Sequence, residues 1–108
     1  MTEERFNKNN SDKKINSRNS LIQSLSDTII NHRKSLHCIG ETGREEFQTA
    51  KYIREYLDKI GVSYETVIET GTVGIIRGNN PKKTVAFRAD IDALNTTEGV
   101  KHLCGHDG

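Results

Sequence analysis

Residues 84–89 read Thr-Val-Ala-Phe-Arg-Ala, and this stretch decides the predicted fold. Its centre is apolar at consecutive positions, as in a strand that is covered on both faces. Two further extended segments, 62–69 and 72–77, precede it and are rich in β-branched residues. Glycines and an Asn-Asn-Pro turn at 79–81 separate the segments. The three segments therefore predict the beginning of a sheet.

Two helical patterns lie before the predicted strands. Apolar residues recur at helical intervals from Leu21 onward, with Asn19 or Ser20 available as the cap. A second helix is predicted over 44–60, and Gly61 follows it, where a left-handed residue ends a helix. This order predicts an α/β fold with a central mixed or parallel sheet flanked by helices, incomplete in this chain.

The first twenty residues are unlike the rest of the chain. They are rich in Asn, Lys, Ser and Glu and contain few apolar side chains. Such a segment cannot bury enough surface to offset its chain entropy. We therefore predict a disordered polar tail over 1–20 and a folded part over 21–108.

Composition excludes several classes of protein. A formal net charge of +1, with three Tyr, three Phe and no Trp, gives neither the field nor the stacking groups that nucleic-acid binding needs. The sequence has no run of about twenty apolar residues, so no membrane span is expected. No apolar stretch precedes Leu21, so we expect no secretory signal and a cytoplasmic protein. In that compartment Cys38 and Cys104 are expected to be free thiols or metal ligands, not a disulfide.

The side chains suited to chemistry gather after the third extended segment. Asp90 and Asp92 follow it directly, and functional groups of α/β sheets collect beyond the carboxyl ends of strands. Cys104 and His106 are two positions apart, so in an extended segment their side chains point the same way. A thiolate and an imidazole together suit zinc and related divalent ions, and Gly105 lets the backbone bend close to an ion.

The alternative for this pair is a packed thiol beside a surface histidine, which a lone Cys-x-His motif favours. The concentration of acidic, imidazole and thiol groups after one strand favours the metal site instead. We further predict that Asp107 orients the His106 imidazole. Three other residues remain less specific: His37 is expected to be a surface or structural residue, His102 either lines the pocket or is exposed, and Glu98 is a surface acid.

A family resemblance adds to this interpretation. Residues 88–94 (Arg-Ala-Asp-Ile-Asp-Ala-Leu) and 102–108 (His-Leu-Cys-Gly-His-Asp-Gly) closely resemble the metal-dependent aminoacylase and carboxypeptidase family of zinc peptidases. The similar branch holds hippurate hydrolase, N-acyl-amino-acid amidohydrolase and the indole-acetyl-amino-acid hydrolases. Segments within 33–49 and 70–74 also resemble that branch, so the resemblance covers about residues 21–108. The chain departs from the branch at Asn95, where proline is common.

The resemblance implies the amino-terminal part of a catalytic domain that binds two divalent ions, Zn or Mn. Cys104 and His106 match metal ligands, and Asp92 falls beside the centre in a supporting role. The implied substrate is a small N-acyl amino acid or peptide, and the full-length enzyme could form homo-oligomers. The family's general-base glutamate lies beyond Gly108.

We therefore expect a truncated amidohydrolase chain that is inactive alone. The first alternative is a non-catalytic metal- or partner-binding remnant of such an enzyme. The second is a redox-active thiol protein that uses Cys38 and Cys104, although their spacing is unlike a Cys-x-x-Cys pair.

Overall fold

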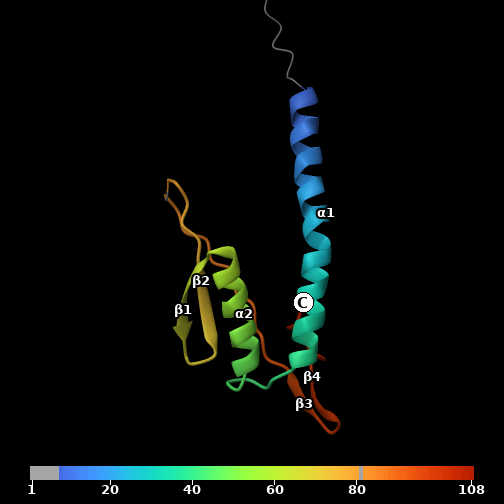
Figure 1. The fold of residues 1–108 in the computed structure, drawn as a ribbon, viewed down its shortest axis with the longest axis vertical. Helices are drawn as coiled ribbons and strands as arrows, with labels where there is room; N and C mark the ends of the chain where they lie inside the picture. The colour runs from blue at the N-terminus through green and yellow to red at the C-terminus, as the bar shows by residue number, and fades with distance from the viewer. Residues whose placement is uncertain (1–7, 81) are drawn as a thin grey trace, which may run out of the picture. The chain divides into compact units, whose positions relative to one another are not determined.

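A computed structural model describes residues 8–80 and 82–108 of the chain (Figure 1). The chain divides into two compact units, Met1–Arg33 and Lys34–Gly108. Helices and strands are both present, as predicted. In chain order the elements are α1 (Lys8–Ile39), α2 (Phe47–Ile60), β1 (Ser63–Val67), β2 (Gly71–Ile75), β3 (Leu94–Thr96) and β4 (Gly99–Lys101).

Helix α1 begins much earlier than the sequence pattern predicts. Its first residue is Lys8, so the predicted start at Asn19 or Ser20 is wrong, and residues 8–20 of the predicted disordered tail are helical. The physical reason is that neither proline nor glycine occurs between positions 8 and 39, and each further residue extends an existing helix at little cost. Residues 1–7 of the predicted tail lie outside the described residues. In the described ranges, no helix combines the length and the apolar character needed to cross a bilayer.

Helix α2 ends as predicted and begins later. Gly61 follows the helix with φ 75°, and its N–H donates to the Asp58 carbonyl at 3.2 Å. The predicted start at residue 44 is wrong because Arg44 itself has a left-handed backbone, with φ 67°, which a helix cannot contain. The helix therefore begins at Phe47.

Strands β1 and β2 form an antiparallel hairpin that packs on α2 (Figure 1). β1 lies inside the predicted segment 62–69, whereas β2 begins at Gly71, one residue before the predicted segment 72–77. Their register pairs Ser63 with Ile75 and Val67 with Gly71. Arg54 of α2 fastens the helix to the hairpin: its Nε donates to Thr72 Oγ1 at 3.0 Å, and its Nη2 donates to the carbonyls of Glu69 and Gly71. The hairpin is thus held to the helix by side-chain hydrogen bonds as well as by packing.

The predicted central parallel sheet is wrong for the residues that the structure describes. Segment 84–89 is not a strand of any sheet, and both sheets are antiparallel and two-stranded. The apolar residues that predicted a doubly covered strand are open to solvent, with Val85 exposed by 74% and Phe87 by 97%. A strand requires a backbone partner, and in the structure no neighbouring strand pairs with this segment. The fold is a mixed α+β arrangement.

The second hairpin, β3–β4, was not predicted. It pairs Leu94 with Lys101 and Thr96 with Gly99 around a two-residue turn. The Thr96 hydroxyl donates to the Gly99 carbonyl at 2.5 Å, and Gly99 has φ 111°, which suits glycine alone. The hairpin lies close to Gly40, where an added Cβ would be 3.3 Å from the Val100 carbonyl oxygen.

The buried apolar residues of the second unit are few and small. Ala50 and Ala93 are the buried apolar residues in the described ranges, and Thr49 is buried beside Ala50 in α2. The Ala93 N–H donates to the Glu41 carbonyl at 2.6 Å and so ties segment 88–93 to the loop before α2. This link places Asp92 next to that loop.

Candidate functional site

Asp92 and His106 form the central contact of the site. Nδ1 of His106 lies 2.7 Å from Oδ1 of Asp92, and both side chains are 37% exposed. An ionised carboxylate only accepts hydrogen bonds, so Nδ1 carries the proton in this contact. A neutral His106 therefore keeps its lone pair on Nε2, the tautomer that a metal ligand needs.

Cys104 contacts the same aspartate. Its thiol donates to the backbone carbonyl of Asp92 at 3.4 Å, and the side chain is exposed. Cys104 and His106 thus both lie against Asp92, although they follow it by twelve and fourteen positions. The structure brings together the three residues that the sequence singled out.

The backbone that carries Cys104 and His106 is not extended as assumed from their spacing. Turns include residues 103–104 and 106–107, and Gly105 between them has φ 83°. The Gly108 N–H donates to the Gly105 carbonyl at 3.1 Å and closes the second turn. Gly105 provides the predicted bend, while the shared contact with Asp92, and not strand geometry, brings the two side chains together.

Asp107 does not orient His106, so that prediction is wrong. Its Oδ2 lies 2.6 Å from Nδ1 of His37 in the last turn of α1. The Asp107 side chain is 2% exposed and the His37 side chain is 47% exposed. Because adjacent side chains reach each other poorly, Asp107 finds its partner across the fold and leaves His106 to Asp92.

His102 is buried, so the alternative of a loop-exposed ring is wrong, but the residue does not line the hollow beside Asp92. The residue is 6% exposed, and its two ring nitrogens have no hydrogen-bond partner in the described structure. Its ring centroid lies 6.1 Å from that of His37. A buried imidazole without a partner costs on the order of 1–3 kcal/mol, so its polar atoms need an explanation other than stability.

Glu41 organises the loop next to the site, a role that the sequence pattern did not reveal. Its carboxylate accepts hydrogen bonds from the N–H groups of Gln48 and Thr49 and from the Thr49 hydroxyl, at 2.7–3.1 Å. Burial would raise the pKa of Glu41, but these hydrogen bonds outweigh it and lower the pKa below its ordinary value. Glu41 thus satisfies the first free N–H groups of α2 in place of a cap at Glu46, which makes no such bond.

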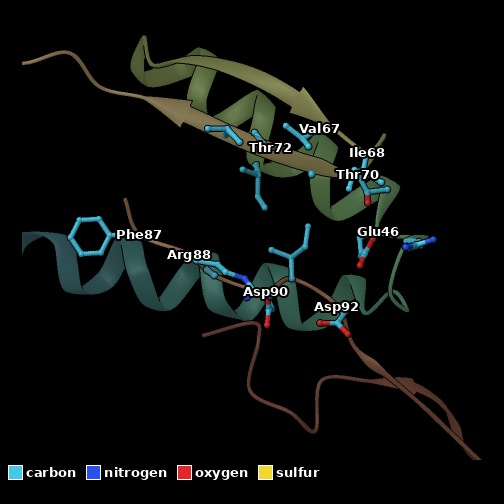
Figure 2. A pocket seen from close by; sticks show the side chains of 15 residues that line it. Glu46, Val67, Ile68, Thr70, Thr72, Phe87, Arg88, Asp90 and Asp92 are labelled. Atoms are coloured by element: carbon cyan, nitrogen blue, oxygen red, sulfur yellow. The ribbon is translucent and has the colours of Figure 1, made fainter. Parts of the chain in front are cut away.

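A hollow of about 620 Å³ lies beside Asp92 (Figure 2). Val67, Ile68 and Thr72 line it on the side of the β1–β2 hairpin, and Phe87 to Asp92 line it opposite. Glu46 is buried at one end, with its Oε2 making no hydrogen bond in the described structure. Asp90 is also among the lining residues, and its carboxylate binds Arg88 at 2.9 Å in a surface ion pair. Apolar side chains and three acidic residues, Glu46, Asp90 and Asp92, therefore line the hollow.

The metal-ligand set within the described residues is incomplete. No cluster of three or more His, Cys, Asp and Glu side chains in 8–80 and 82–108 is arranged to hold a metal ion. Cys104 and His106 provide a donor set that suits a divalent ion, but two donors do not complete a tetrahedral site. Both Cys38 and Cys104 are free thiols, as predicted. The two thiols are not bonded to each other, and the redox-pair alternative therefore gains no support.

Comparison with known proteins relates this chain to part of larger hydrolases. An uncharacterized hydrolase of Staphylococcus haemolyticus is 44% identical over 91 residues, which cover 74% of this chain and 24% of that protein. Uncharacterized hydrolases of Staphylococcus saprophyticus and Staphylococcus aureus are 40% and 37% identical to this chain. Each match covers 74% of this chain, and 23% and 24% of the length of those two hydrolases, respectively. The chain thus spans about a quarter of the length of the curated relatives it matches. No family model matches the chain, and neither does a solved structure.

Proposed function

We propose that this chain is part of a metal-dependent amidohydrolase that cleaves N-acyl amino acids, in the manner of aminoacylases and hippurate hydrolases. One observation carries the proposal: Asp92 binds His106 at 2.7 Å while Cys104 contacts its carbonyl. A carboxylate that fixes a histidine tautomer beside a thiol is the outer partner that metal-ligating histidines require. The similarity to hydrolases supports the general class of reaction.

In this proposal Nε2 of His106 and the thiolate of Cys104 hold a divalent ion, Zn or Mn. When bound, such an ion polarises the amide carbonyl and lowers the pKa of water. The chain's own residues perform a different task. Asp92 keeps the proton on Nδ1 of His106 and fixes its ring. The 102–108 loop carries both ligand atoms, Nε2 of His106 and the sulfur of Cys104.

The proposed substrate is small. The hollow beside Asp92, about 620 Å³, falls within the range of roughly 300–1,000 Å³ that small-molecule sites occupy. Its apolar lining residues, Val67 and Ile68 on one side and Phe87 on the other, suit an acyl chain. We propose that the full-length enzyme is cytoplasmic, holds a second ion through further ligands and uses a glutamate as the general base.

A metal-binding remnant without catalysis is the second candidate. The observation that favours it is the incomplete ligand set in the described residues. A general base contributes about 10²–10⁴ in rate, so a remnant that lacks one is expected to be nearly inactive. Hydrolysis of N-acyl amino acids by the purified chain separates the candidates: turnover that depends on added Zn²⁺ or Mn²⁺ and is lost in Cys104→Ser contradicts the remnant.

Cobalt binding tests the site that both candidates share. Co²⁺ bound by a thiolate produces a charge-transfer absorption, and we expect this absorption in the parent chain. We expect Cys104→Ser to abolish it and Cys38→Ser, the matched control at the other exposed thiol, to preserve it. His106→Ala is expected to weaken affinity without removing the thiolate signal. Equal absorption in Cys104→Ser and Cys38→Ser would remove Cys104 as a ligand.

A further inference from the structure

Two adjacent side chains of the 102–108 loop bind opposite neighbours. His106 turns to Asp92 at 2.7 Å, and Asp107 turns to His37 at 2.6 Å. The two contacts join the loop to segment 88–93 and to the last turn of α1. Because the residues are consecutive, the peptide between them is held from both sides.

The contact between His37 and Asp107 contains the more deeply buried of the two carboxylates, while the His37 side chain itself is 47% exposed. The Asp107 side chain is 2% exposed, whereas both partners of the His106 contact are 37% exposed. A buried carboxylate is costly unless donors satisfy it, and Nδ1 of His37 is such a donor. The ring of His102 lies at the same place, 6.1 Å from the His37 ring, and is itself buried. Loss of the His37 ring would therefore open a buried polar cluster to water.

The backbone of the loop gives it little support of its own. Residues 103–104 and 106–107 are in turns, and the segment belongs to neither sheet. Gly105 at φ 83° adds conformational freedom in the middle of the loop. Fixing such a backbone costs roughly 1–2 kcal/mol per residue, so side-chain tethers determine whether the ligand atoms are held in place.

We propose that His37 is a positioning residue for the metal site: by binding Asp107 it fixes the 102–108 loop so that Cys104 and His106 can act on one ion. This inference rests on the proposed function, since it assigns His37 a role toward the ion that those residues hold. In the structure His37 binds the Asp107 carboxylate, and we assign its effect on the site to that contact.

The test uses the full chain with Cys38→Ala, so that Cys104 is the sole thiol. His37→Ala removes the donor, and His37→Asn restores an N–H donor near the position of Nδ1. Two quantities are measured: Co²⁺ affinity from the thiolate charge-transfer band, and amide hydrogen exchange of residues 103–108 without metal. Ser35→Ala, at an exposed position of the same helix end, is the control.

We expect His37→Ala to lower Co²⁺ affinity by about 10-fold or more, as loss of an outer partner does. We also expect it to speed amide exchange in the loop, and His37→Asn to recover much of both. Unchanged affinity in His37→Ala, in a parent that binds Co²⁺, would overturn this inference and leave the proposed function standing. A parent that binds no Co²⁺ would overturn both. An affinity loss that His37→Asn fails to recover, with unchanged loop exchange, would also count against the positioning role.

Discussion

The carboxylate of Asp92 lies 2.7 Å from Nδ1 of His106, although fourteen positions separate the two residues. Asp90, only two positions before Asp92, instead pairs with Arg88 at the surface. The two aspartates of one motif thus have different surroundings, and of the two only Asp92 contacts His106 in the described structure. That difference makes them a matched pair for experiment.

We predict that Asp92→Ala lowers Co²⁺ affinity by about 10–100-fold, because the His106 ring loses the group that fixes its tautomer. Asp92→Asn keeps an oxygen acceptor and is expected to lose less. Asp90→Ala is expected to change affinity little, since an exposed ion pair contributes roughly 0–1 kcal/mol. Titration followed by the thiolate absorption measures all three. Similar losses in the Asp90 and Asp92 variants would show that general charge, not tautomer control, governs binding.

The stability supplied by Glu41 is predicted to depend on pH. Hydrogen bonds from Thr49 and Gln48 hold the pKa of Glu41 below its ordinary value of 4.5, so the folded state favours the ionised carboxylate. This contribution is fully present above the ordinary pKa and is lost as the pH falls through the lowered value. Glu41→Gln is therefore expected to reduce the free energy of unfolding by about 1 kcal/mol at pH 7, as loss of a helix cap does.

Urea unfolding of the parent and Glu41→Gln at pH 7 and below pH 4 measures this effect. The difference between them should shrink in acid. Glu55→Gln serves as the control because Glu55 is exposed on α2 and lies 3.9 Å from Lys51. A difference between parent and Glu41→Gln that stays constant with pH would mean that the carboxylate charge is not what stabilises the helix.

The end of α2 and the extended segments that form β1 and β2 could be predicted from sequence because local chemistry determines them, whereas the antiparallel pairing of the two strands was not predicted. Gly61 ends α2 as its pattern indicates, and the segments around Gly71 form the hairpin. Segment 84–89 could not be placed in this way. Its apolar pattern indicates a buried strand, but pattern alone cannot supply the strand that must pair with it, and Phe87 is exposed by 97%.

The candidate site shows the same division between local and long-range information. The motifs at 88–94 and 102–108 were enough to single out Asp92, Cys104 and His106, because the types of side chain and their spacing are visible in the sequence. The long-range hydrogen bonds around the site could not be predicted from the sequence. The contact between His37 and Asp107 spans seventy positions, and nothing in either residue's neighbourhood indicates the other. Glu41 likewise finds Thr49 only after the loop has folded.

The hairpin turn depends on glycine at position 71. A Cβ added to Gly71 would lie 2.5 Å from the Val67 carbonyl oxygen, a backbone atom that cannot move alone. Gly71→Ala is expected to reduce the free energy of unfolding by about 1–3 kcal/mol, as overpacking does. Gly78→Ala is the control, since a Cβ there meets nothing within 4 Å. Both variants restrict the unfolded chain equally, so the difference between their urea midpoints isolates the steric clash. Equal midpoints would show that the turn can shift to accept a side chain.

Substitution of His102 tests whether its buried ring stabilises the fold or serves the proposed metal site. Its ring is buried, and neither ring nitrogen has a hydrogen-bond partner in the described structure, so an apolar side chain of similar size should fit at lower cost. We predict that His102→Leu raises the free energy of unfolding by about 1 kcal/mol, because the desolvation penalty of the imidazole disappears. Urea unfolding measures this change, with Leu103→Ala, at an exposed neighbouring position, as a control for alteration of the loop. If His102→Leu instead destabilises the chain, the imidazole already has a stabilising partner, such as an ordered water. If His102→Leu stabilises the chain while Co²⁺ affinity falls, the buried imidazole favours metal binding and lowers the stability of the fold.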